Sequence, residues 1–163
     1  MASTLQPLAH AAIGTVFALL EYLRETPSGR EDLYKLGDPL GYVLDDLLPI
    51  VEAAKQLGLL RIVAGDIELT DEGRRVAAAD DPERKRLMSA RLAGLPLIAD
   101  IRQALEARAA GRVGKKAFLD LLKERYSPVE AEKQIATAVD WARYGALFDF
   151  DPDAEEFVLG TLS

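Results

Sequence analysis

Apolar residues between Leu44 and Gly58 recur at steps of three and four, which places them on one face of a helix. Gly58 supplies the left-handed residue that commonly ends a helix. Two short apolar runs follow, Leu60–Val63 and Ile67–Thr70, on either side of Ala64-Gly65-Asp66, and this pattern predicts a β-hairpin with glycine in the turn. A helix, a glycine stop and a hairpin in this order are typical of a winged-helix module.

The residues before this module predict two further helices. Pro7 to Glu25 is apolar on nearly every side of a helix, so we expect a helix that is buried on more than one side, by a second domain or a second chain. Arg30 to Leu36 has the pattern of a short helix, which the turn residues Gly37–Gly41 would close.

The middle of the chain predicts helices that connect this module to the rest. Asp81-Pro82-Glu83 has the signature of a helix start, because proline suits the first helical position and an acidic residue suits the first turn. Gly94-Leu95-Pro96 is expected to break the helix. Helical spacing resumes from Leu97 to Ala109, and Ala110–Gly114 is predicted to be a loop.

The last third of the chain predicts the same order of elements. Lys115–Arg125 has helical spacing, and Ser127-Pro128-Val129-Glu130 is a capping-box start for a helix that ends at Tyr144. Leu147–Phe150 and Glu156–Leu159 then flank a turn, as two strands of a second hairpin do.

This order suggests an internal repeat. Aligning Leu57-Gly58-Leu59-Leu60 with Tyr144-Gly145-Ala146-Leu147 places Ala54 opposite Trp141. The predicted fold is mainly α with small β-hairpins, built from tandem winged-helix-like units joined by helices: a first unit at residues 1–80, and a linker helix with a second unit at residues 81–163.

The composition narrows the possible functions. In a chain of 163 residues, 49% apolar residues can fill a core and 29% charged residues keep it in solution. The absence of cysteine excludes disulfides and thiolate chemistry and fits a cytoplasmic protein. The most apolar run, Leu8–Leu20, is shorter than the roughly 20 residues that cross a bilayer and lacks the features of a signal peptide, so we expect no membrane span.

DNA binding, the function that a winged helix first suggests, is disfavoured by charge. The chain has 27 acidic and 20 basic side chains, a formal charge of −7, whereas phosphate contacts require clustered Lys and Arg. The third helix of the first unit carries Asp45, Asp46 and Glu52 against Lys55. A winged-helix DNA-binding transcriptional regulator therefore remains only the alternative interpretation.

One basic cluster, Arg84-Lys85-Arg86 with Arg91 and Arg74-Arg75, has two interpretations. On a helix these residues spread around the axis beside Asp80, Asp81 and Glu83, which favours a solvated or salt-bridged face. An anion-binding or partner-docking site is the other interpretation.

The remaining motifs do not predict a metal site or a phosphate site. Asp149–Asp153 alternates carboxylates as a calcium loop does, but Ala154 and Gly160 stand where that loop requires Gly and Glu. Gly111–Lys116 is too short for a phosphate loop. His10 is the single histidine of a chain without cysteine, so a transition-metal site or His-based catalysis is not expected.

The sequence predicts no catalytic residue, cofactor or metal, and hence no enzyme. No pair of carboxylates lies in an apolar setting of the sequence that would shift a pKa. Trp141 and Tyr144 are expected to pack in a core or an interface.

Several separate blocks of the sequence match a known family in order. They are Gly29–Tyr34, Asp45–Pro49, Gly65–Thr70, Glu72–Arg75, Glu83–Leu87, Phe118-Leu119 and Ala138–Tyr144. On these blocks the chain resembles, from about Leu8 to Leu159, the C-terminal AAA-associated domain found on ATP-binding subunits of bacterial ABC transporters of the nitrate/sulfonate/bicarbonate type. The resemblance implies an accessory, regulatory domain associated with the uptake of anions or organic nutrients, either cut from a longer protein or free-standing.

The resemblance does not imply ATP hydrolysis by this chain, which lacks the motif G-x-x-x-x-G-K-[ST]. We therefore expect a protein-interaction domain whose partner is an ABC transporter ATP-binding subunit or domain, with a possible homodimer through Leu8–Leu23. A sensor of nitrate, sulfonates or bicarbonate between the two units is a third hypothesis.

Overall fold

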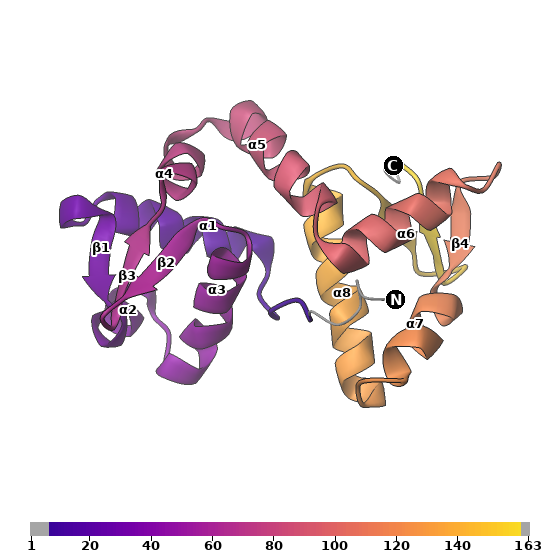
Figure 1. The fold of residues 1–163 in the computed structure, drawn as a ribbon, viewed down its shortest axis with the longest axis horizontal. Helices are drawn as coiled ribbons and strands as arrows, with labels where there is room; N and C mark the ends of the chain where they lie inside the picture. The colour runs from indigo at the N-terminus through magenta and orange to yellow at the C-terminus, as the bar shows by residue number, and fades with distance from the viewer. Residues whose placement is uncertain (1–6, 161–163) are drawn as a thin grey trace. The chain divides into compact units, whose positions relative to one another are not determined.

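The computed structural model describes residues 7–160, which are mainly α-helical with two small antiparallel sheets (Figure 1). The predicted fold class is therefore confirmed. The chain divides into two compact units. The N-terminal unit is Ala9–Leu87, and the C-terminal unit consists of the described residues from Met88 onward together with Pro7 and Leu8. Helix α5 (Asp81–Ala93) continues from the first unit into the second.

The N-terminal unit surrounds a three-stranded sheet with helices. Its other elements are α1 (Ile13–Arg24), a short 3-10 turn (Pro27–Gly29), β1 (Arg30–Asp32), α2 (Leu33–Leu40), α3 (Leu44–Gln56), β2 (Leu60–Val63), β3 (Asp66–Leu69) and α4 (Asp71–Ala78). The strand order is β1-β3-β2, with antiparallel neighbours. Ala64 and Gly65 both have positive φ in the β2–β3 turn, as the tightest hairpin turns require. The first predicted hairpin is thus confirmed.

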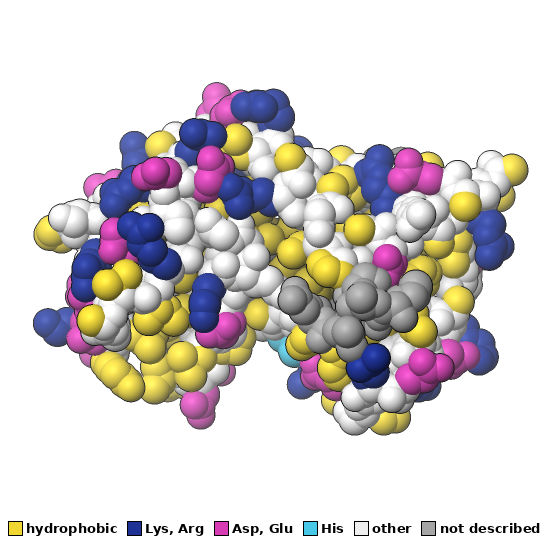
Figure 2. Space-filling model, in the orientation of Figure 1, with side chains coloured by type: hydrophobic (Ala, Val, Ile, Leu, Met, Phe, Trp, Pro, Cys, Tyr) yellow, Lys and Arg dark blue, Asp and Glu magenta, His cyan; other side chains and the backbone are white. Residues whose placement is uncertain are grey.

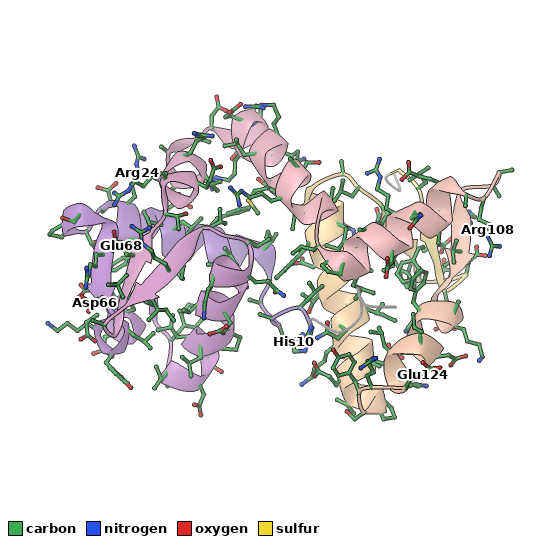
Figure 3. The ribbon with its side chains drawn as sticks, viewed as in Figure 1. His10, Arg24, Asp66, Glu68, Arg108 and Glu124 are labelled. Carbon is green, nitrogen blue, oxygen red and sulfur yellow. The ribbon has the colours of Figure 1, made fainter. Side chains whose placement is uncertain are left out.

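The first strand corrects the sequence analysis, which predicted a helix from Arg30 to Leu36. Residues 30–32 instead pair with β3, and the Arg30 guanidinium contacts the carboxylates of Asp66 at 2.8 Å and Glu68 at 3.7 Å; both acids are labelled on β3 in Figure 3. Asp32 then caps α2 by accepting a hydrogen bond from the Tyr34 N–H. These contacts with residues distant in sequence decide the strand, so helical spacing could not reveal it.

The first helix is shorter than predicted, beginning at Ile13 rather than Pro7. Two glutamine side chains instead hydrogen-bond the backbone of the segment before the helix. The Leu8 N–H donates to Gln134 Oε1 at 2.8 Å, and the Leu8 carbonyl accepts from Gln134 Nε2 at 3.0 Å. The Ala9 N–H donates to Gln56 Oε1 at 3.1 Å. From Ile13 onward, α1 packs against α3, α4 and β3 of its own unit.

The C-terminal unit repeats the order of helix, strand, two helices and hairpin. Its elements are α6 (Pro96–Glu106), β4 (Arg112–Gly114), α7 (Lys115–Lys123), α8 (Pro128–Tyr144), β5 (Asp149–Asp151) and β6 (Glu156–Val158). The strand order β4-β6-β5 matches that of the first sheet, and the second predicted hairpin is confirmed. Strand β4 replaces the loop predicted there. Arg112 contacts Asp151 and Glu156 of its hairpin, as Arg30 contacts its own.

The alignment of the repeat is shifted by one residue from the prediction. The Leu59 N–H donates to the Ala54 carbonyl after α3, and the equivalent bond after α8 joins Leu147 to Ala142, both at 2.9 Å. Residues with positive φ at the two helix ends are Gly58 and Ala146. Gly58 therefore corresponds to Ala146 rather than Gly145, and the residue opposite Trp141 is Ala53 rather than Ala54.

The predicted alignment paired Gly145 with Gly58, but Gly145 does not have the left-handed conformation that Gly58 has. The φ of Gly145 is −78°, which any residue adopts. A Cβ there would lie 3.3 Å from Leu92 Cδ1 and 3.4 Å from Ser89 Cα, and the Ser89 hydroxyl donates to the Gly145 carbonyl. The close approach of α5 thus favours glycine at this position.

Candidate protein-interaction site

Four large apolar side chains are exposed where α2 meets the start of α3: Tyr34 at 77%, Val43 at 67%, Leu44 at 37% and Leu48 at 38%. We call them the apolar rim. Figure 2 shows hydrophobic side chains gathered over α2 and the first turns of α3, at the lower left of the view. Single exposed apolar residues are ordinary, whereas exposed apolar residues gathered on one face are a candidate interaction surface.

The apolar rim borders a hollow between the two helices, which we call the α2–α3 groove. Its cavity volume is about 310 Å³. The groove is lined by Leu33, Tyr34, Gly37, Asp38, Tyr42, Val43, Leu44 and Leu47. The floor is formed by the buried side of α3, since Leu47 is fully buried.

A tight helix end shapes this groove. Gly41 has a φ of +79° and ends α2, and the Tyr42 N–H donates to the Gly37 carbonyl at 2.8 Å. A Cβ on Gly37 would lie 2.5 Å from the Tyr42 carbonyl oxygen. The two glycines therefore allow the chain to reverse within a few residues and bring α2 against α3.

Val43 stands at a position where a polar residue would stabilise the helix. It is the N-cap of α3, and its side chain makes no capping hydrogen bond. Ser, Thr, Asp or Asn at an N-cap is worth about 1 kcal/mol over an apolar residue. Ala12 and Leu95 are also N-caps without a side-chain hydrogen bond, so it is the exposure of Val43, at 67%, that favours a role in contact.

Acidic residues surround the groove. Asp38, Asp45 and Asp46 are all exposed, and none of them makes an ion pair with any described residue. Lys35 is the single basic residue between Leu33 and Ala54 in the sequence. The surface around the apolar rim therefore carries three carboxylates whose charges are not neutralised by an ion pair with a described residue.

The equivalent face of the C-terminal unit has a different chemistry. Positions Leu44 and Leu48 of α3 correspond to Glu132 and Ala136 of α8, counted back from the matching helix ends. Lys115 Nζ pairs with Glu132 at 2.7 Å. A cavity of about 290 Å³ lies along this face, lined by Lys115, Glu132, Ile135, Ala136, Val139, Asp140, Arg143 and Phe150.

Residues of the basic cluster near α5 contact different neighbours instead of forming one basic surface. Arg84 is turned inward: its guanidinium donates to the Val76 and Ala77 carbonyls at the end of α4 and lies 4.9 Å from the centre of the Phe17 ring. Arg86 pairs with Glu83 on the same helix, and this hydrogen-bonded guanidinium lowers the pKa of Glu83. This arrangement agrees with the salt-bridged interpretation of the cluster.

The acidic residues of β5 likewise contact different neighbouring groups. Asp149 is buried and pairs with Arg143 at 2.7 Å. Asp151 accepts hydrogen bonds from the Ala154 and Asp153 N–H groups, and these bonds and Arg112 lower its pKa. Within residues 7–160 no group of three or more His, Cys, Asp or Glu side chains is placed to hold a metal ion.

The other residues that the sequence brought forward lie outside the groove. His10 lies on the segment before α1 (Figure 3). Trp141 is fully buried, in agreement with its predicted packing role. Tyr34 and Val43, the most exposed members of the apolar rim, were not singled out by the sequence; the signal for Val43 was an apolar residue directly before the acidic first turn of α3. None of the described helices is long and apolar enough to cross a membrane.

Comparison with known families agrees with the resemblance seen in the sequence. Residues 34–151 match the family of the C-terminal AAA-associated domain, a range that contains the apolar rim, α3 and α8. The chain therefore belongs to this family, which consists of accessory domains linked to AAA ATPases. No curated protein and no solved structure matches the chain.

Proposed function

We propose that this chain is a cytoplasmic accessory domain, without enzymatic activity, that binds the ATP-binding subunit or domain of an ABC transporter for nitrate, sulfonate or bicarbonate and regulates its ATPase cycle. Family membership supports the link to an ATPase. The observation that carries the proposal is the α2–α3 groove, because an exposed apolar hollow bordered by uncompensated acids suits contact with protein.

We interpret the order of elements in both units as winged-helix-like, so DNA binding is the function to weigh against this one. A DNA-reading helix offers cationic or amide side chains to base edges. The exposed face of α3 instead carries Leu44 and Leu48 with Asp45 and Asp46 in the first turn. Apolar and acidic groups at this position favour protein contact and repel phosphate.

A bound accessory domain regulates an ATPase by binding one of its states better than another. The shift in the equilibrium between states equals the difference between the two affinities. Regulation therefore requires an association that depends on the nucleotide, and this dependence is open to measurement.

Co-purification of the chain with its cognate ATP-binding subunit, in the absence of nucleotide, with ADP and with ATP, tests the proposal. We expect association that differs between these states and an ATPase rate that changes when the chain is added. Absence of association in all three states, together with an unchanged rate, would refute it. Bovine serum albumin at equal concentration controls for non-specific effects.

The alternative, a transcriptional regulator, is tested by a gel shift with the DNA upstream of its own gene. A DNA-binding winged helix should shift this DNA at low salt and lose affinity steeply as salt rises. We expect no shift at micromolar protein concentration. A salt-sensitive, sequence-specific shift would favour the alternative.

A homodimer through Leu8–Leu23 is the second assembly that we propose to test. The exposed stripe of α1 contains Gly14, Ala18 and Glu21, and small residues allow two helices to approach closely. Sedimentation velocity of the chain at micromolar concentration measures this directly, and a single monomer boundary would exclude the dimer.

A further inference from the structure

We infer that the α2–α3 groove binds an amphipathic helix of the partner protein, one that places apolar residues in the groove and Lys or Arg around them. This inference rests on the proposed function for the identity of the partner, but its chemistry follows from the groove itself. Three features of the groove specify the occupant: its apolar rim, its helical walls and its charge.

The apolar rim specifies the face that enters the groove. Leu44 and Leu48 are one helical turn apart, so they lie side by side along α3. Val43 and Tyr34 extend this surface towards α2, with Val43 exposed at 67% and Tyr34 at 77%. Burial of apolar surface is the main favourable contribution to most protein–protein association, and tyrosine is among the residue types that carry most of an interface's affinity. The partner must therefore present a row of apolar side chains.

The walls of the groove specify a helix. The groove is bordered by α2 and α3. Apart from the N–H groups in the first turn of α3, its helical walls offer an extended peptide no row of backbone donors and acceptors. An extended peptide usually binds by adding to a sheet edge, whereas an amphipathic helix satisfies its own backbone and buries its apolar face in a hydrophobic groove.

The charge around the groove specifies the flanks of that helix. Asp38, Asp45 and Asp46 are exposed and have no ion-pair partner among the described residues. Lys or Arg on the partner would complement them and increase the association rate. Such exposed pairs are screened by salt, so binding should weaken as ionic strength rises.

The same charges disfavour a second copy of this chain as the occupant. A symmetric dimer brings the same surface of both subunits together. The aspartates of both copies would then lie at one interface, and like charges gathered at an interface oppose association. We therefore assign the groove to a basic partner helix rather than to self-association.

Two synthetic 16-residue helices serve as probes for the full chain. One has a leucine face flanked by lysine, and the other has the same leucines flanked by glutamate. Amide chemical shifts of the ¹⁵N-labelled chain locate the site, and a titration gives each Kd. We expect the lysine helix to perturb residues of α2 and the first two turns of α3, and to bind at least tenfold more tightly than the glutamate helix.

Val43→Ser tests the apolar contact without endangering the fold. Serine is a good N-cap, so this variant should fold at least as well as the original chain. Its matched control is Val129→Ser, which alters a 66% exposed valine in the first turn of α8. We expect at least fivefold weaker binding of the lysine helix to Val43→Ser and unchanged binding to Val129→Ser.

The double variant Asp45→Asn, Asp46→Asn tests the charge. Its control, Glu124→Gln with Asp153→Asn, removes the same number of charges from exposed positions of the C-terminal unit. We expect several-fold weaker binding and a flatter salt dependence only in the first double variant. Equal losses in both pairs, or shifts centred outside α2 and α3, would overturn the inference.

The inference and the proposed function fail in different ways. If the ATP-binding subunit co-purifies equally with the original chain, Val43→Ser and the Asp45/Asp46 variant, the groove is not the docking site although the function stands. If the lysine helix binds the groove as expected but the subunit never associates, the proposed function falls and the groove chemistry stands.

Discussion

Replacing Gly73 with alanine should destabilise the N-terminal unit, although alanine is the better helix former. Gly73 lies in the first turn of α4, directly after the hairpin. A Cβ at this position would lie 1.8 Å from the Leu59 carbonyl oxygen, where real Cβ contacts essentially never fall below 3.0 Å. The obstacle is backbone, so α4 or the start of β2 would have to move by about 1 Å.

That movement acts on the hydrogen bonds that attach α4 to the sheet. The Thr70 N–H donates to the Leu59 carbonyl at 3.2 Å, and the Thr70 hydroxyl donates to the Gly58 carbonyl at 2.7 Å. Each is worth about 1 kcal/mol net, and overpacking strain costs a further 1–3 kcal/mol or so. Alanine returns about 1 kcal/mol through helix propensity. The expected loss in unfolding free energy is about 2–4 kcal/mol.

Urea denaturation followed by far-UV circular dichroism measures this loss, and Gly14→Ala is the matched control. Gly14 is also helical, but a Cβ there has no heavy atom within 4 Å, so alanine should raise stability by up to about 1 kcal/mol. The fluorescence of Trp141, the single tryptophan, follows the C-terminal unit. Equal or higher stability of Gly73→Ala would show that the junction of α4 relaxes freely and would refute the reasoning.

Two further predictions concern charged groups. Arg84→Lys removes two hydrogen bonds to the end of α4 and the guanidinium over the Phe17 ring, because lysine lacks the planar guanidinium group. Urea denaturation should show a loss of about 1–3 kcal/mol in unfolding free energy. An unchanged midpoint would contradict the role of Arg84 in capping α4. In Asp151, hydrogen bonding by Ala154 and Arg112 lowers the folded-state pKa below 3.8, so its stabilisation is present above that pH and is lost as pH falls below it. Thermal melts should therefore show a weaker acid dependence below about pH 4 in Asp151→Asn than in the original chain.

Helix caps and hairpin turns were the parts of the fold that the sequence predicted best, because their signals are local. Ser127 accepts the Glu130 N–H at the start of α8 as its capping box predicts, and Gly58 has the expected positive φ. The three-residue strands β1 and β4 could not be predicted in this way. Each owes its structure to pairing with a hairpin strand more than thirty residues later in the chain, where periodicity carries no information.

Glycine was the residue that sequence reasoning interpreted least reliably. The sequence analysis aligned Gly145 with Gly58, but the residue with positive φ at the end of α8 is Ala146, and α5 lies close against Gly145. A glycine can serve backbone conformation or close approach, and only the tertiary neighbours distinguish the two. Because the sequence could not distinguish these two roles, the predicted alignment of the two units was shifted by one residue.

The corrected alignment separates what the two units share from what they do not. The buried residues of α3 match buried residues of α8 position by position: Leu47, Ile50, Val51, Ala53 and Ala54 correspond to Ile135, Ala138, Val139, Trp141 and Ala142. The exposed positions differ, since Leu44 and Leu48 stand where α8 has Glu132 and Ala136. The shared core explains why the two units have the same fold. Packing does not require apolar side chains at the exposed positions, so Leu44 and Leu48 call for an explanation other than packing. In the sequence, Leu44 and Leu48 belong to the apolar stripe of α3 and cannot be distinguished from core residues. Only the structure shows that their side chains are exposed. For this reason the sequence could predict the fold but not the proposed docking surface.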